Sequence, residues 1–577
     1  MIKLGAFLSL AFIALPSWLS AKAGEPVQTI GFNEITVGGE LKTRIDKNMA
    51  RLEEEKYQPD HVFLTEEQSG GWPGDTEGRT ILGLVLDAQT AHRAPRYLTE
   101  ILNRLPDHLN KKGYMGSIYP DEVNEQQLSG NGWMLRGLCE YYLWTKDKRT
   151  LQWIRSFADN LFMTAAPFYA NYPLLPNERK NNVGAESGSI QNTVNHWMLS
   201  SDIGCVFIGM EGFIQAYQVL REPAMRPVIE NMIQKFLQMK LVDMKAQTHA
   251  TLTACRGLIR FADITGDKKY VIEAEKRYDI YRSAGLTANF ENYNWFNRFD
   301  TWTEPCAIVD SYMLAMQLWQ HTGKTIYLED AEHIYYNALC HTQRKNGGFG
   351  CDNCPGKAIQ TPFLKVHADE AHWCCTMRGG EGLSRVAEYS CFKQNRTVFI
   401  TSFHDAKFNL HLGNKQLSME EQTGYPFDGN VQLIVRQNTA GQVDLRIFMP
   451  SWGNNYTLTV NGKIQKIIRV GDFASLKRTF KTGDVVKLNF NEVLGYSKST
   501  DTNLADYYQL RPYYGPLYLG LESKDAIHLS PADFEHLEKT GPAKFTVKSK
   551  NIVLTPIYHL MDSKVWSGTG YQKQIIF

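Results

Sequence analysis

The sequence predicts an α+β multidomain protein, in which an α/α toroid is followed by one or two β-sandwich domains. Three observations lead to this fold class. A helical hairpin unit recurs between about residue 41 and residue 390, the hydrophobic period becomes strand-like near Asn395, and 577 residues exceed what one core usually holds. We therefore expect a helical domain at residues 24–392 and β-sandwich domains at residues 393–577.

The first 23 residues are typical of a secretory signal peptide. Lys3 supplies the positive charge, residues 4–20 form the apolar stretch, and Ala21-Lys22-Ala23 fits a cleavage site. A membrane anchor is the alternative, but Pro16 interrupts the apolar run, which is short for a span. We therefore expect a secreted or periplasmic protein, cleaved near Ala23, with no membrane span afterwards.

The unit that recurs in the helical region is a hairpin of two apolar helices joined by a short polar turn. The turns carry Gly or basic residues, which satisfy the carbonyl groups at helix C-termini. Long loops rich in Gly, Trp and Asn separate the hairpins, as expected of a toroid that builds a pocket at one rim. A plain solenoid is the alternative. The turns of the four copies are Thr145–Lys148, Arg221–Pro223, Thr265–Lys268 and Thr322–Lys324.

Short strands with regular turns follow the helical region. Tyr456–Val460 leads into Asn461-Gly462, a strong hairpin signal, and Thr482-Gly483-Asp484 forms a second turn before the strand Val485–Leu488. This spacing indicates one or two β-sandwiches. Further segments of β-rich composition are Thr397–Ile400, Val431–Val435 and Val443–Ile447.

Charge and cysteine content narrow the function classes. The formal net charge of +1 gives no electrostatic reason to expect nucleic acid or an anionic membrane as a partner. Five of the ten cysteines fall between Cys340 and Cys375, and clustering of this kind fits a metal site better than a disulfide framework. Cys139, Cys205 and Cys255 lie in apolar helical stretches, where we expect them to be core residues.

Two segments place cysteines at the starts of predicted helices. Thr303-Glu304-Pro305-Cys306 opens one helix, with Thr303 as its cap and Pro305 in its first turn. His372-Trp373-Cys374-Cys375 precedes another. Three thiolates and the Glu304 carboxylate would meet the four-coordinate preference of zinc, and two helix N-termini would offset part of the excess negative charge. Buried thiols beside a capping Glu are the alternative.

A rival ligand set lies between these two segments. Cys351-Asp352-Asn353-Cys354 forms a C-x-x-C knuckle followed by Pro-Gly, a shape that zinc sites often use. Together with Cys374 and Cys375 it could build a structural four-cysteine site without a catalytic role. Alternatively, Cys351 and Cys354 could form a disulfide. The sequence does not separate these cases.

These motifs resemble glycoside hydrolase family 127, the non-reducing-end β-L-arabinofuranosidases, which pair a Glu-x-Cys segment with a later Cys-Cys segment to hold zinc. The resemblance implies an (α/α)6 barrel with β-sandwiches and a Zn²⁺ cofactor held by Glu304, Cys306, Cys374 and Cys375, with Cys374 as the nucleophile. Further landmarks in the family's order are His249-Ala250-Thr251, Thr265-Gly266-Asp267, Tyr425–Gly429, Met449–Trp452, Val460-Asn461-Gly462 and Tyr514-Gly515-Pro516.

The chain also departs from the family's pattern. The Cys-Cys pair runs into Thr376-Met377-Arg378 where the family has Pro-Pro-Asn, and Gly209–Gly212 replaces a His-Gln-Glu-rich stretch. The nearest match to the acid/base Glu is Glu291, at a shorter spacing before Glu304; Asp300 and Glu211 are competing acids. Because these changes fall near the expected pocket, a related pentose or an acidic plant-wall sugar is an alternative to arabinofuranose.

The resulting prediction is an exported retaining glycoside hydrolase that removes a terminal sugar from plant cell-wall oligosaccharides. Cys374 would attack the anomeric carbon, and Glu291 would serve as acid and then base. We expect His249, His372 and Trp302 to bind substrate. Two other classes are open alternatives: a toroid polysaccharide lyase or uronide hydrolase without catalytic zinc, and a non-catalytic glycan-binding protein.

Overall fold

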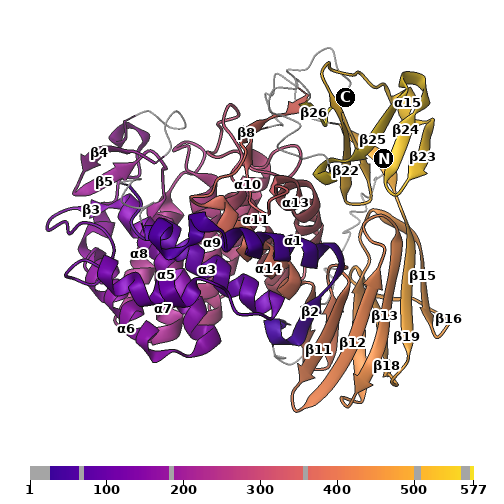
Figure 1. Cartoon of the computed structure of the whole chain (residues 1–577), viewed down its shortest axis with the longest axis horizontal. Helices are drawn as coiled ribbons and strands as arrows, with labels where there is room; N and C mark the ends of the chain where they lie inside the picture. The colour runs from indigo at the N-terminus through magenta and orange to yellow at the C-terminus, as the bar shows by residue number, and fades with distance from the viewer. Residues whose placement is uncertain (1–25, 64–70, 181–187, 355–361, 499–508, 560–571) are drawn as a thin grey trace, which may run out of the picture.

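The structure of the chain is a computed structural model that describes residues 26–63, 71–180, 188–354, 362–498, 509–559 and 572–577. The predicted signal peptide lies outside the described residues. Figure 1 shows three bodies: a helical barrel, a β-sandwich, and a smaller β domain near the C-terminus. Within the described part of the chain, no helix combines the length and apolar character that a membrane crossing needs.

The helical body is a closed barrel of paired helices. In the described part of the chain, each of six inner helices packs on the next, and the last packs back on the first. This closure confirms the predicted (α/α)6 barrel. The inner helices are α3 (Asp75–Ala91), α5 (Glu125–Thr145), α7 (Val206–Leu220), α9 (Thr248–Thr265), α11 (Pro305–Thr322) and α14 (Cys375–Tyr389). The outer helices are α1 (Gly39–Leu52), α4 (Leu98–Arg104), α6 (Lys148–Phe157), α8 (Met225–Gln238), α10 (Lys269–Ala284) and α12 (Ile326–Ile334).

Small residues let the inner helices approach closely. A Cβ atom on Gly132 of α5 would lie 2.5 Å from the Cα atom of Gly209 in α7, and one on Gly212 would lie 2.2 Å from the carbonyl oxygen of Gly132. Only glycine fits such an approach. The polar turns end their helices as predicted, with Gly266 and Gly323 in the left-handed conformation after α9 and α11.

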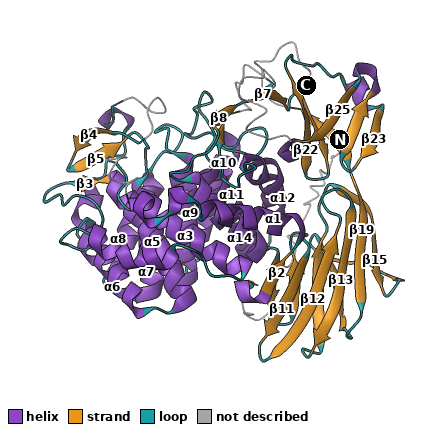
Figure 2. Ribbon diagram, in the orientation of Figure 1, coloured by secondary structure: helices purple, strands orange, loops and turns teal. Residues whose placement is uncertain are grey.

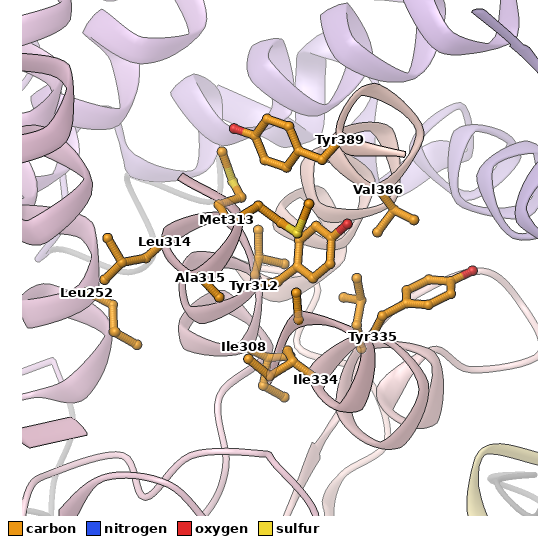
Figure 3. Packing of buried hydrophobic residues seen from close by; sticks show 14 of the residues in the cluster. Leu252, Ile308, Tyr312, Met313, Leu314, Ala315, Ile334, Tyr335, Val386 and Tyr389 are labelled. Carbon is orange, nitrogen blue, oxygen red and sulfur yellow. The ribbon is translucent and has the colours of Figure 1, made fainter. Parts of the chain in front are cut away.

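A continuous apolar core joins the last part of the barrel. Figure 3 shows side chains of α11, such as Ile308 and Tyr312, packed among residues of α12 and α14, including Ile334 and Val386. All four are at most 2% exposed. This packing holds α11 and α14 side by side, and the two cysteine segments stand at the N-terminal ends of these helices.

The β-sandwich follows α14 directly. Its two sheets have the orders β1-β9-β10-β14-β18-β17 and β16-β15-β19-β13-β12-β11-β2. Asn461 and Gly462, both with positive φ, form the predicted hairpin turn between β15 and β16. The strands are β9 (Cys391–Gln394), β10 (Thr397–Ile400), β11 (Ala406–Leu412), β12 (Lys415–Thr423), β13 (Gly429–Asn438), β14 (Gln442–Phe448), β15 (Gly453–Val460), β16 (Lys463–Gln465), β17 (Ile468–Val470), β18 (Phe473–Thr479) and β19 (Val485–Glu492).

Two N-terminal strands join this sandwich rather than the barrel. β1 (Gln28–Thr29) pairs with β9, and β2 (Ile35–Val37) pairs with β11. The described chain therefore starts in the sandwich and enters the barrel at α1. Pairing across more than 350 residues leaves no local pattern in the sequence.

A third β body follows the sandwich along the chain and lies above it in the view of Figure 2. Strand β26 (Gln572–Gln574) pairs on one side with β22 and on the other with β7 (Phe363–Leu364), which belongs to a loop of the barrel rim. The end of the chain is thereby held against the barrel. The other strands are β20 (Leu494–Lys498), β21 (Leu510–Tyr514), β22 (Leu517–Ser523), β23 (Leu537–Gly541), β24 (Lys544–Val547) and β25 (Ile552–Pro556).

Short strands decorate the rim of the barrel that carries the N-termini of the inner helices. One small sheet has the order β3-β5-β4, and another pairs β6 with β8. Their loops supply several residues of the cavity described below. The strands are β3 (Val123–Asn124), β4 (Ile190–Val194), β5 (Trp197–Ser200), β6 (Cys351–Asp352) and β8 (Val366–Ala368).

Candidate active site

A cavity of about 430 Å³ opens at the N-terminal ends of the inner helices. The first turns of α3, α7, α9, α11 and α14, or the residues that cap them, contribute to its wall. Helix N-termini carry partial positive charge, so the cavity favours anionic groups. A larger hollow of about 870 Å³ lies on the sandwich, but no cysteine, histidine or aromatic residue lines it. Residues of these three kinds line the barrel cavity instead, among them Cys374, His249 and Trp302.

The cavity floor holds a group that we name the sulfur cluster: Glu304, Cys306, Cys374 and Cys375. One potential ligand atom from each residue lies within 4.8 Å of the others. The Cys306 Sγ atom is 3.7 Å from that of Cys375, and the Sγ atoms of Cys374 and Cys375 are 3.2 Å apart. The structure thus brings together the two segments that the sequence separates by about seventy residues.

Local structure explains how these side chains are presented. Glu304 is the N-cap of α11 and Pro305 its first residue, whereas Cys374 caps α14 and Cys375 opens it. The predicted cap Thr303 was wrong by one position. Its hydroxyl accepts a hydrogen bond from the Asp352 amide, since Thr303 belongs to the loop that precedes the helix.

The sulfur cluster fits a divalent zinc ion. Tetrahedral zinc–thiolate bonds of about 2.3 Å place sulfur atoms roughly 3.7 Å apart. The Cys306–Cys375 distance of 3.7 Å matches this spacing, and the Cys374 and Cys375 sulfurs lie closer, at 3.2 Å. Burial raises the pKa of Cys306 and Cys375 well above the ordinary thiol value. A cation at this point would therefore be needed to hold them as thiolates. Cys374 is the one partly exposed cysteine of the cluster, and it faces the cavity.

Arg79 contributes a positive charge beside the sulfur cluster, and it is not among the residues predicted from the sequence. Its Nη1 atom donates to Cys306 Sγ at 3.1 Å, and its other nitrogens hold the Asp75 carboxylate at 2.6 and 3.0 Å. The guanidinium also lies 4.2 Å from the centroid of the Trp133 ring. The available signal was an Asp and an Arg one turn apart at the start of a helix that follows Trp-Pro-Gly.

His249 connects the cluster to the interior of the barrel. Its Nδ1 atom lies 3.3 Å from Glu304 Oε1, and its Nε2 atom lies 3.3 Å from Asp310 Oδ2. Burial alone lowers the pKa of His249, but the two carboxylates raise it above the ordinary value. Asp310 in turn accepts from Arg378 at 2.6 Å and pairs with Arg256. His249 therefore orients Glu304 as well as lining the cavity.

The aromatic and histidine candidates are distributed differently. Trp302 lines the cavity and stacks on His367, with ring centroids 4.7 Å apart. Trp373 also lines it and is 48% exposed, so it offers a free face to a ligand. His372 packs edge-on against Trp373 at 5.0 Å and is not among the described cavity-lining residues.

Glu291 lies in a separate group, which we name the carboxylate–histidine cluster: Glu291, His341 and Asp352. All three side chains are fully buried, and His341 Nδ1 is 2.9 Å from Glu291 Oε1 and 3.4 Å from Asp352 Oδ2. Burial, with the Asp352 charge beside it, raises the pKa of Glu291 well above the ordinary value. Glu291 is not among the described residues that line the cavity.

Two cations face the carboxylate–histidine cluster. Arg344 Nη2 is 3.1 Å from Asp352 Oδ1, and Lys573 of strand β26 is fully buried beside both carboxylates. Burial lowers the pKa of Lys573 well below the ordinary value. A proton on either Glu291 or Lys573 leaves the group electrically neutral, so its charge balance does not require a metal ion.

The remaining predicted residues are not members of the sulfur cluster. Cys354 donates to the carbonyl of Asn292 and does not join the four ligands, so its position does not support the four-cysteine alternative. Cys351 lines the cavity near Cys375, and every cysteine is free. Of the competing acids, Glu211 is held by arginines inside the barrel, and Asp300 pairs with Arg298 on the surface.

Residues 76–388 match the model of the β-L-arabinofuranosidase GH127 catalytic domain, and residues 397–492 match that of the GH127 middle domain. No protein with a curated description matches the sequence.

Solved structures share the whole architecture. A GH127 β-arabinofuranosidase is 16% identical, with a TM-score of 0.66, over 96% of this chain and 98% of that chain. A GH127 β-L-arabinofuranosidase from Geobacillus stearothermophilus T6 is 14% identical, with a TM-score of 0.65, over 94% of this chain and 99% of that chain. At these identities the likeness establishes the fold.

Proposed function

The chain belongs to glycoside hydrolase family 127, and from this premise we propose that it is an exported, retaining glycosidase with a zinc-held cysteine nucleophile. Its substrate would be a terminal β-L-arabinofuranosyl unit, or a related sugar, on plant cell-wall glycans. The observation that carries the proposal is the sulfur cluster at the floor of a cavity of sugar size, with Cys374 as its partly exposed member.

Zinc would be held by Glu304, Cys306, Cys374 and Cys375, and it would supply the positive charge that keeps the three sulfurs deprotonated. Arg79 supports the same charge state, because its guanidinium already donates to Cys306. Burial raises the pKa of Glu304, but His249 and Arg79 outweigh burial and lower it, so Glu304 is present as a carboxylate.

The walls of the cavity suit a sugar. Trp302 and Trp373 supply aromatic surface, on which the C–H face of a sugar ring can rest, and the N-termini of inner helices supply polarity. In a retaining reaction, the Cys374 thiolate forms a bond to the anomeric carbon and the leaving oxygen takes a proton from a carboxylic acid. Water then releases the sugar with the original configuration.

The test is a screen of plant cell-wall oligosaccharides, and of aryl glycosides of terminal pentoses, with the zinc-loaded wild type, Cys374→Ala and the control Cys391→Ala. Cys391 is buried in β9, away from the cavity. We expect monosaccharide release by the wild type and the control, and a loss of at least about a thousandfold for Cys374→Ala.

Mass spectrometry of the wild type after a rapid quench should show a glycosyl adduct on the peptide that contains Cys374. Monosaccharide release that survives Cys374→Ala would refute the nucleophile. Wild-type binding of oligosaccharide without turnover would instead support the glycan-binding alternative.

A further inference from the structure

A retaining glycosidase needs a second group, a carboxyl that reaches the leaving oxygen from the same cavity as the nucleophile. Three carboxylates are present among the described cavity-lining residues: Asp75, Asp202 and Glu304. Glu291 is not one of them, since its carboxyl lies in the carboxylate–histidine cluster. Among the residues that the structure describes, the choice of acid and base is therefore between these three side chains.

Two of the three, Asp75 and Glu304, already serve other partners. Both oxygens of Asp75 accept hydrogen bonds from Arg79, at 2.6 and 3.0 Å, so this side chain is fixed on Arg79 by a bidentate ion pair. Glu304 belongs to the sulfur cluster, where it must stay ionised to serve as a ligand. Neither is suited to alternate between the acid and the carboxylate.

Asp202 is held in a different way. It lies in the turn between β5 and α7, where its Oδ2 atom accepts the Gly188 amide at 2.7 Å and its Oδ1 atom accepts Gln247 Nε2 at 3.1 Å. A side-chain amide has a donor end and an acceptor end, so Gln247 can turn over and accept a hydrogen bond from a protonated Asp202. Gln247 can thus serve Asp202 in both protonation states.

The position of Asp202 also suits proton transfer. Gly188, Asp202 and Gln247 all line the cavity that Cys374 faces, and they come from a rim loop, β5–α7 and the start of α9. Asp202 is 1% exposed, so little water competes for its proton. Elements on a closed barrel rim hold their relative places, as a catalytic pair requires.

We propose that Asp202, rather than Glu291, is the acid/base residue of the glycosidase; this inference rests on the proposed function. In the first step, Asp202 gives its proton to the glycosidic oxygen. The Cys374 sulfur forms the bond to the anomeric carbon, and the electron pair of the broken C–O bond stays on the departing alcohol. In the second step, the Asp202 carboxylate takes a proton from water, the water oxygen bonds to the carbon, and the electron pair of the C–S bond returns to sulfur.

The experiment compares Asp202→Asn, Glu291→Gln and Cys374→Ala on paired substrates that differ only in the leaving group. The substrates are 4-nitrophenyl and methyl glycosides of β-L-arabinofuranose and of related pentoses. Nitrophenolate can leave as an anion, whereas the methoxy group must be protonated to leave as methanol. We expect Asp202→Asn to lower kcat/KM for the methyl glycoside by about 10²–10⁴-fold and for the nitrophenyl glycoside far less.

Azide supplies the second readout. Because azide needs no general base, it should restore turnover of the nitrophenyl glycoside by Asp202→Asn and give a glycosyl azide of retained configuration. If Asp202 has only a structural role, Asp202→Asn should lower kcat/KM for both substrates equally, and azide should restore no turnover. Zinc content and melting temperature of Asp202→Asn, together with Asp202→Glu, check that the cavity is intact.

The outcomes separate the two proposals. Full activity of Asp202→Asn on the methyl glycoside, with Cys374→Ala inactive, overturns the Asp202 assignment alone. Leaving-group dependence and azide rescue in Glu291→Gln assign the role to Glu291 and also overturn the Asp202 assignment. Activity in Cys374→Ala, or no wild-type turnover of any glycoside with zinc bound, overturns the proposed function and this inference with it.

Discussion

The described part of the barrel contains two clusters with similar ligand chemistry, one with a surplus of negative charge and one that is neutral. In each, at least three Cys, His, Asp or Glu side chains bring ligand atoms within 4.8 Å of one another. The sulfur cluster borders a cavity and would carry up to four negative charges, with the Arg79 guanidinium in contact. The carboxylate–histidine cluster is sealed. Arg344 pairs with Asp352, and one proton on either Glu291 or Lys573 makes the cluster neutral.

The difference teaches that ligand spacing alone does not define a metal site. A buried group with a surplus of negative charge needs a cation, because an uncompensated buried charge costs several kcal/mol. A buried group that the chain itself neutralises needs none. By this criterion the sulfur cluster is the candidate metal centre, and the carboxylate–histidine cluster is a link between the barrel and the C-terminal strand.

The largest expected effect concerns metal content. Cys375→Ala removes a buried ligand, so zinc should fall from one per chain to near zero, and activity should fall by at least about a thousandfold. Glu291→Gln should retain one zinc per chain. Elemental analysis of both purified variants measures this contrast. Loss of the metal from Glu291→Gln with retention in Cys375→Ala would reverse the assignment of the two clusters.

The next effect concerns the stability of the carboxylate–histidine cluster. Lys573→Met removes the hydrogen bond to the Ile557 carbonyl and leaves Glu291 as the only place for the shared proton, which we expect to lower the free energy of unfolding by about 1–3 kcal/mol. Adding Glu291→Gln should restore part of this loss, because glutamine needs no proton to be neutral. Denaturant titration of the two single variants and the double variant measures the coupling. Additive effects would mean that Lys573 and Glu291 do not interact.

A smaller effect is expected beside the sulfur cluster. Arg79→Met removes the donor to Cys306 and leaves all four ligands, so zinc affinity should fall by about 10–100-fold. Arg385→Met is a matched control, since Arg385 pairs with Glu140 and Glu388. Competition with a chromogenic chelator measures both affinities. Equal zinc affinity in wild type and Arg79→Met would show that Arg79 plays no part in holding the metal.

The smallest effect tests the rival ligand set. Cys354 contacts Thr301 and the Asn292 carbonyl, so Cys354→Ser should leave zinc content at one per chain and change activity by no more than about twofold. Metal loss from this variant would favour the structural four-cysteine site that the C-x-x-C knuckle suggested.

Much of the fold could be predicted from the sequence, because periodicity and turn chemistry are local. The hairpin turns at Gly266 and Gly323 and the Asn461-Gly462 turn are where the pattern put them. The additions of β1, β2 and β26 to distant sheets could not be predicted in this way. Each is a two- or three-residue strand whose partner is far away along the chain.

For the site, the sequence by itself determined which residues could bind a soft cation and that they stand at helix starts. The Glu-x-Cys segment and the adjacent Cys pair are visible in the sequence itself, and the helix signals around them are local. Their approach to within ligand distance came only with closure of the barrel, which sets α14 against both α11 and α3.

Tertiary structure also decided which carboxyl faces the cavity. Glu291 and Asp202 look alike as loop acids, but one is buried against Arg344, Lys573 and His341, whereas the other lies at the cavity wall. Lys573 reaches this position from the last strand of the chain, almost three hundred residues after Glu291. The physical reason is that the pKa of a group and its access to the cavity depend on every segment packed around it. The local sequence pattern carries no information about those distant neighbours.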